Sequence, residues 1–108
     1  MIGQLSPPTL RDWLNDRSRP QPLLLDVREP WEYDLCRIID SQLISLKDLP
    51  QRWNELPRGQ DIIVICHHGV RSQQAARFLE DAGFLQLYNL SGGIAAWAEQ
   101  IEPTMPRY

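Results

Sequence analysis

The sequence predicts an α/β fold in which a mainly parallel sheet carries helices on both of its faces. Short apolar runs, typical of strands covered on both sides, alternate along the chain with segments of helical spacing. This alternation favours crossover connections and places ligands at the carboxyl ends of the strands. With 108 residues the chain has room for one domain. We expect residues 1–108 to form it, with a core over about 5–101 and a C-terminal tail over 102–108.

Capping residues and apolar spacing indicate the elements of the first half. Ser6 is a suitable N-cap and Pro7 a suitable first residue for a helix, and apolar residues follow at helical spacing. Leu23 to Val27 is an apolar run with a single acid, as expected for a central strand, and Pro30 opens a second helical stretch. The expected elements are a helix over 7–16, a strand over 23–27, a helix over 30–35, a strand over 42–46 and a helix over 47–56.

The second half places a cysteine between a strand and a helix. Ile62 to Ile65 is the most β-branched run of the chain and leads directly into Cys66. Alanines at helical spacing follow and stop at Gly83. The expected elements are a strand over 62–65, a helix over 72–82, a strand over 85–90 and a helix over 94–101.

Composition and residue spacing exclude several classes of function. The formal net charge is -3 and the basic residues are scattered, so we expect no nucleic-acid partner. No apolar run approaches the roughly 18 residues of a membrane span, and the first residues lack a secretory signal, so we expect a cytoplasmic protein without membrane contact. His67 and His68 are adjacent rather than spaced as ligands, so no metal is expected.

The segment after the β-branched run has the features of a nucleophilic loop. Gly69 permits a tight reversal of the backbone around Cys66, because glycine tolerates positive φ. Amides that point into such a turn, beside a helix N-terminus, form an anion site and favour the thiolate. The same amides would stabilise the terminal sulfur of a persulfide, and Arg71 would offer its planar fork to an anionic donor.

Each of these residues also has a structural interpretation. A cysteine after an apolar run is commonly a buried core residue, but such a residue gains nothing from Gly69 and Arg71 at these spacings. Arg71 alone would be a solvated surface residue, and its position just before the helix favours the loop instead. His67 and His68 would bind substrate or tune Cys66 through their rings, or contribute only their amides.

Three ordered segments resemble the rhodanese homology domain. Leu24 to Tyr33 resembles the first signature of that family, Cys66 to Ser72 its active loop, and Leu90 to Trp97 its closing segment. Three signatures in order are more specific than any one of them. The resemblance implies a parallel five-stranded sheet, no required cofactor, and Cys66 as the residue that carries a transferable sulfur. It also implies an active loop whose amides cradle that sulfur, from His67, His68, Gly69, Val70 and Arg71, and supporting roles for Asp26, Arg28 and Ser72.

Asp26 and Arg28 would support the loop or brace the sheet edge, or would form only a structural salt bridge.

One segment departs from the family pattern: Cys36 to Ser41 stands where the family usually has Gly-His-Ile-Pro-Gly-Ala. The available backbone angles change with the loss of both glycines and the proline. Cys36 would resolve a persulfide as a disulfide or, as we favour, serve as a small packed residue.

The resemblance implies a sulfurtransferase that takes sulfur from a small anionic donor, thiosulfate, or from a protein persulfide. The acceptor would be cyanide or a thiol, including a thioredoxin-like or sulfur-relay protein. One alternative is a cysteine-dependent phosphatase or arsenate reductase, whose signature places five residues between Cys and Arg, whereas four separate Cys66 from Arg71. A second alternative is a non-catalytic module that binds a partner or carries sulfur within an assembly. The presence of Cys66 argues against an inert binding module but is compatible with a sulfur carrier.

Overall fold

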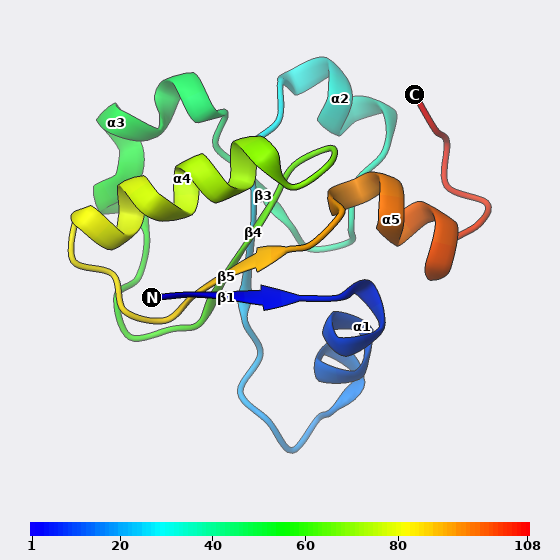
Figure 1. Cartoon of the computed structure of the whole chain (residues 1–108), viewed down its shortest axis with the longest axis horizontal. Helices are drawn as coiled ribbons and strands as arrows, with labels where there is room; N and C mark the ends of the chain where they lie inside the picture. Colours follow the sequence, from blue (N-terminus) through cyan, green and yellow to red (C-terminus); the bar gives the residue numbers. More distant parts are fainter.

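The computed structural model describes residues 1–108 and contains one five-stranded sheet between two helical layers (Figure 1). All four pairs of neighbouring strands are parallel. This architecture confirms the predicted class. In spatial order the strands are β1 (Ile2–Leu5), β5 (Leu87–Leu90), β4 (Ile62–Ile65), β2 (Leu23–Asp26) and β3 (Gln42–Leu43).

The helices lie near their predicted positions, with one exception. They are α1 (Pro7–Asn15), α2 (Pro30–Leu35), α3 (Leu49–Arg52), α4 (Val70–Asp81) and α5 (Gly93–Gln100). The continuous helix predicted over 47–56 is instead three short pieces, because α3 is flanked by the 3-10 turns Leu46–Asp48 and Trp53–Glu55. Pro50 has no amide hydrogen, so an α-helical bond pattern cannot run through it from the preceding turn. None of these helices is long and apolar enough to cross a membrane.

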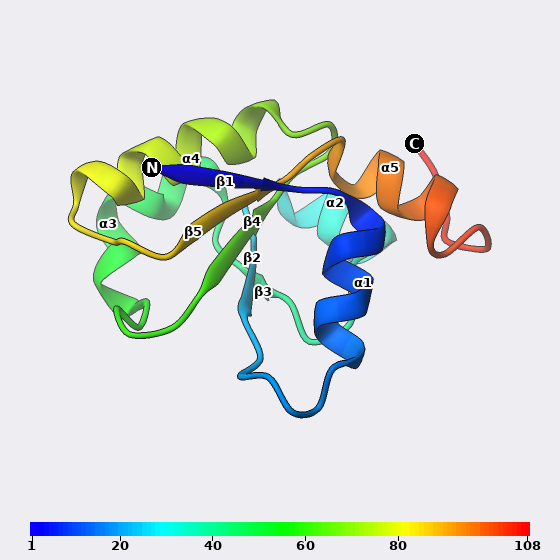
Figure 2. The ribbon, with the colours of Figure 1, turned by 60° about the horizontal axis from the view of Figure 1, so that its bottom comes forward.

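The central strand β4 supplies side chains to both layers. Ile62 and Val64 belong to the hydrophobic cluster that includes residues of α3 and α4. Ile63 and Ile65 belong to the opposite cluster, which includes residues of α1 and α5. All four side chains are buried, and each contributes about 1.5–3 kcal/mol of hydrophobic free energy. Figure 2 shows the sheet between these two layers.

The first strand, β1, is absent from the elements that the residue pattern predicts. It has only four residues and pairs along one edge with β5, where Gly3 lies opposite Tyr88. A Cβ atom on Gly3 would lie 2.6 Å from Cδ2 of the Tyr88 ring. Glycine is therefore required by close packing, at a position where it weakens the strand signal in the sequence.

The segment 102–108, predicted to be a tail outside the core, packs against the domain. Met105 is buried in the cluster with α1 and α5. Glu102 accepts a hydrogen bond from Nε1 of Trp97 at 3.0 Å. The Tyr108 side chain reaches Glu32 of α2 and the ring of His67, which follows β4.

The segment Cys36–Ser41 forms its turn without glycine. Asp40 has a φ of 66°, in the left-handed region where the resemblance places a glycine. Ile38 is buried, and the hydroxyl of Tyr33 donates to the carbonyl of Ser41 at 2.5 Å. These contacts hold the turn in one conformation, which the sequence alone did not predict.

Candidate active site

The candidate site is the loop that joins β4 to α4. Cys66 is 1% exposed, and its Sγ accepts a hydrogen bond from the Gly69 amide at 3.0 Å. Gly69 has a φ of 99°, so the reversal expected there uses the left-handed region. The Ser72 hydroxyl, on the first turn of α4, lies 3.2 Å from Sγ. The structure thus brings these three predicted residues together.

The first two carbonyl groups of this loop are bound by helix α5. The amides of Ile94 and Ala95, in the first turn of α5, donate to the carbonyls of Cys66 at 2.8 Å and His67 at 3.0 Å. A Cβ atom on Gly93 would collide with both carbonyls, so only glycine fits at the start of α5. Helix α5 therefore fixes which way the peptide groups of the loop face.

Four amides of the loop remain available to an anion. The N–H groups of His67, His68, Val70 and Arg71 donate to no acceptor in the chain. They surround the N-terminus of α4, which carries partial positive charge. Together with the Gly69 amide they can stabilise negative charge on a sulfur bonded to Sγ.

Ser72 connects the sulfur to a buried polar network. Its Oγ donates to Oδ1 of Asn89 at 2.5 Å, and Nδ2 of Asn89 donates to the Gly69 carbonyl at 3.2 Å and to Gln4 Oε1 at 3.0 Å. Asn89 was not among the predicted site residues. The sequence contains one signal for Asn89: it is a polar residue inside an otherwise apolar strand. A buried amide side chain needs hydrogen-bond partners, so this pattern indicates a buried polar contact.

The fork of Arg71 is occupied by Glu32. Nη1 and Nη2 of Arg71 donate to Oε1 and Oε2 of Glu32 at 2.7 and 2.8 Å. The Tyr108 hydroxyl donates to the same carboxylate at 2.7 Å. The bonds from Arg71, then from Tyr108, lower the pKa of Glu32 to about 2 despite its burial, and burial together with Glu32 raises the pKa of Tyr108 to about 12. Glu32 therefore holds the end-on face of the guanidinium, and the role of Arg71 towards an anionic donor stays a prediction.

Asp26 and Arg28 form a fully buried ion pair, with Nη2 of Arg28 2.7 Å from Oδ2 of Asp26. Burial opposes the charge of Arg28, but the bonds to Asp26 and then Tyr108 outweigh it and raise its pKa. Arg28 also donates to the carbonyls of Glu32 at 3.2 Å and Cys36 at 2.6 Å. The pair thus braces the C-terminal part of α2, and no hydrogen bond joins it to Cys66.

The His67 ring is stacked with the rings of Tyr108 and His68. The His67 ring lies 4.0 Å from the Tyr108 ring and 4.1 Å from the His68 ring, measured between centroids. Burial, and then the neighbouring His68, lower the pKa of His67. No hydrogen bond joins either ring to Cys66. A cavity of about 160 Å³ opens beside the two rings and is bordered by Tyr108.

Cys36 packs away from the active loop. Both cysteines are free. Cys36 belongs to the cluster that includes residues of α1 and α5, whereas Cys66 belongs to the one with α3 and α4. Cys36 accordingly has the packing of a small core residue.

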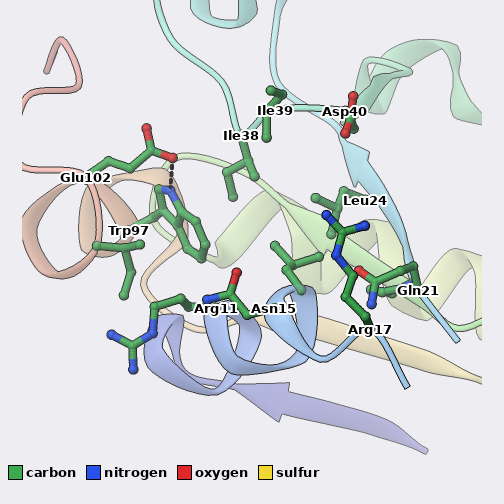
Figure 3. A pocket seen from close by; sticks show the side chains of 13 residues that line it. Arg11, Asn15, Arg17, Gln21, Leu24, Ile38, Ile39, Asp40, Trp97 and Glu102 are labelled. Atoms are coloured by element: carbon green, nitrogen blue, oxygen red, sulfur yellow. Dashed lines mark hydrogen bonds between the residues drawn. The ribbon is translucent and has the colours of Figure 1, made fainter. Parts of the chain in front are cut away.

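The largest cavity lies elsewhere. It has a volume of about 470 Å³ and lies between α1, α5 and the turn at Asp40, with Trp97 and Leu24 on its apolar wall (Figure 3). No residue of the segment 66–72 lines it. The largest cavity is therefore separate from the candidate site at Cys66.

Glu32 and Tyr108, like Asn89, were not predicted as site residues. Glu32 lies inside the first signature segment, but its partner Arg71 is 39 positions away and only the fold reveals the pair. Tyr108 lies in the predicted tail, and its contact with Arg28 spans 80 positions. Pattern arguments over short windows cannot detect contacts of this range.

The fold and the loop define an α/β protein with a cysteine in an amide cradle at the end of a central strand. Residues 6–100 match the family model described as Rhodanese-like domain. The chain belongs to this rhodanese-like family.

Similar proteins include several named as sulfurtransferases. The chain is 40% identical over 106 residues to a probable adenylyltransferase/sulfurtransferase MoeZ of Mycobacterium tuberculosis, with 96% of this chain and 26% of that protein covered. It thus spans about a quarter of that relative. It is 34% identical over 98 residues to a sulfurtransferase of Allochromatium vinosum, covering 91% of this chain and 90% of that protein.

A solved structure of similar size shares the fold. The rhodanese-related protein of Thermoplasma volcanium superposes with a TM-score of 0.83 at 32% identity, covering 94% of this chain and 96% of that one.

Proposed function

We propose that this protein is a sulfurtransferase that carries a sulfane sulfur as a persulfide on Cys66. The observation that carries the proposal is the loop geometry, in which Sγ accepts one amide and four further loop amides have no acceptor in the chain. A persulfide places a negative terminal sulfur beyond Sγ, where these N–H groups stabilise it. The sulfurtransferase names of similar proteins support the same reaction class.

The reaction is a double displacement. The Cys66 thiolate attacks the outer sulfur of thiosulfate or of a protein persulfide, a new S–S bond forms, and sulfite or the donor thiolate leaves with the electron pair of the broken bond. A thiol or cyanide then attacks the terminal sulfur, and Cys66 leaves again as the thiolate. The four-residue spacing between Cys66 and Arg71 disfavours the phosphatase alternative.

The physiological acceptor is proposed to be a protein. Relatives that contain a similar segment are named adenylyltransferase and sulfurtransferase, such as MOCS3 of Arabidopsis thaliana, which is 31% identical over 108 residues. A thioredoxin-like dithiol or a sulfur-relay protein supplies the thiol that this chemistry requires.

The test is to incubate the wild type with thiosulfate and to measure the mass of the Cys66 peptide. We expect one added sulfur, ping-pong kinetics with cyanide, and no loading or turnover in Cys66→Ser. Cys36→Ser is the matched control, because it removes the other thiol and leaves the loop intact. A Cys66 that stays unmodified in folded protein with both thiosulfate and a persulfide donor, or phosphatase turnover with no sulfur transfer, would refute the proposal. Loading without transfer to any small acceptor would identify a carrier module.

A further inference from the structure

We propose that Glu32 is a specificity-determining residue that makes the Cys66 site favour a persulfide donor over thiosulfate. The inference rests on the proposed sulfur transfer and concerns the class of donor. Glu32 lies on α2, outside the active loop, and acts on the donor by occupying the one cationic side chain of that loop.

The first observation is that Glu32 occupies the end-on face of the Arg71 guanidinium. Both terminal nitrogens of its guanidinium donate to the two oxygens of one carboxylate, at 2.7 and 2.8 Å. Glu32 is itself 4% exposed in its side chain and held in place by the Tyr108 hydroxyl and by the Glu29 amide, which donates to Oε1 at 2.9 Å. A thiosulfate ion would have to displace this carboxylate to bind both terminal nitrogens end-on, and elsewhere on the guanidinium it would meet a charge that Glu32 already neutralises.

The second observation is the charge balance around the loop. Arg71 is neutralised by Glu32, and Arg28 by Asp26. The cavity beside the histidine rings is bordered by one acid, Glu99, and one base, Arg107. No side-chain positive charge is left in excess, so an incoming donor is held by backbone N–H groups.

The two donor classes differ in the charge that they bring to this site. Thiosulfate concentrates two negative charges on one small ion and releases sulfite. A persulfide brings a single charge at the reacting end, because its S–S bond breaks to leave a thiolate while the outer sulfur bonds to Cys66. The dipoles of the loop amides can stabilise one negative charge. Binding a second negative charge without a nearby cation costs free energy.

The third observation is an apolar surface that suits the organic part of a persulfide. Trp31 is 61% exposed, and its ring lies 5.4 Å from that of Tyr108 in an edge-on arrangement. Tyr108 in turn stacks on His67 of the active loop. The carbon skeleton of a thiol or a peptide can pack on this surface, whereas thiosulfate gains nothing from it.

The experiment measures the first half-reaction by quenched flow and mass spectrometry, with thiosulfate and with freshly prepared cysteine persulfide as donors. In Glu32→Gln the carboxylate charge is removed and the shape is kept, which frees the charge of Arg71. We expect the ratio of the thiosulfate rate to the persulfide rate to rise about tenfold over the wild-type ratio, as expected for one uncompensated charge near a protein surface. The intrinsic reactivity of each donor cancels in this comparison.

Glu55→Gln is the matched control, because it removes the same charge from an exposed Arg–Glu pair with Arg52 outside the loop. Its donor ratio is expected to equal that of the wild type. A folded Glu32→Gln with an unchanged ratio would overturn the inference while the sulfurtransferase proposal stands. If neither donor loads the wild type, the proposed function itself fails.

Salt dependence tests the same idea in the unaltered protein. Without an available cation, thiosulfate loading should change by less than about twofold between about 50 and about 500 mM KCl, because there is no attraction for the salt to screen. A steep fall in the loading rate with salt would reveal a free cation at the site and refute the role of Glu32.

Discussion

Ser72 lies between the sulfur of Cys66 and the buried amide of Asn89. Its single hydroxyl hydrogen is donated to Asn89 Oδ1 at 2.5 Å, while Sγ of Cys66 is 3.2 Å away. A thiolate or persulfide at Cys66 can recruit this hydroxyl by a rotation about one bond, because a hydroxyl rotates freely to suit its partner. Ser72 is thus the only side-chain hydroxyl in hydrogen-bond contact with the sulfur.

In Ser72→Ala we expect slower sulfur loading of Cys66 and a loss of about 1–3 kcal/mol in the free energy of unfolding, because Asn89 Oδ1 loses its buried donor. Loading is measured by mass spectrometry, and stability by urea titration. Ser18→Ala, which alters an exposed serine bonded to Asp16, is the control. An unchanged loading rate in the folded variant would show that the hydroxyl does not assist the sulfur.

Glu32 makes a pH-dependent contribution to stability. Its pKa falls from the usual 4.5 to about 2 in the folded protein, chiefly through Arg71 and Tyr108. Because the folded pKa is the lower one, this stabilisation is fully present above pH 4.5 and is lost as the pH falls towards 2. We expect the wild type to lose about 2–3 kcal/mol from this group over that interval.

Urea titrations at pH 7 and pH 3 measure this difference. Glu32→Gln should be less stable than the wild type at pH 7, and the gap between them should narrow at pH 3. A constant gap at both pH values would show that the Glu32 charge is not the source of the effect.

At the scale of elements, the strand before the cysteine and the helix after it follow from local sequence. The β-branched run Ile62–Ile65 and the alanines of α4 suffice to place Cys66 at their junction. What short patterns could not predict is the part of the site set by tertiary contact. Tyr108 and Glu32 act across the fold, β1 is a short edge strand that contains Gly3, and the turn at Asp40 depends on its neighbours.

Helix α5 determines the orientation of the loop through its first turn. In Gly93→Ala the new methyl group would meet the carbonyls of Cys66 and His67, and the φ of 60° disfavours a side chain. We expect sulfur loading of Cys66 to fall more than about tenfold, because the amides no longer converge on the sulfur. Gly59→Ala is the control, because nothing lies within 4 Å of a Cβ at that position. A Gly93→Ala variant that folds and loads at the wild-type rate would contradict this account of the loop.

At the scale of the whole molecule, segment 102–108 links helix α2 to the active loop. Tyr108 contacts Arg28 before α2, Glu32 within α2, and His67 in the active loop. One side chain thereby joins an ion-pair network to the peptide groups around the cysteine.

Two variants separate the parts of this contact. In Tyr108→Phe the ring stack is kept and the hydroxyl is lost, and we expect a decrease of about 1–2 kcal/mol in the free energy of unfolding. In Tyr108→Ala the stack is lost as well, and we expect a larger decrease together with slower loading, because His67 loses the ring that holds it. Urea titration and the mass assay measure both. Equal stability of all three proteins would show that the contact contributes nothing to the fold.

The outward bonds of the loop carbonyls also set an order of assembly. The groups that hold Cys66 and His67 belong to residues 94 and 95, and the partner of β1 is β5, so the first strand made pairs with the last. A chain in which α5 has not docked lacks the two amides that hold the carbonyls of Cys66 and His67. We therefore expect the amide cradle around Cys66 to form only once the final helix has docked.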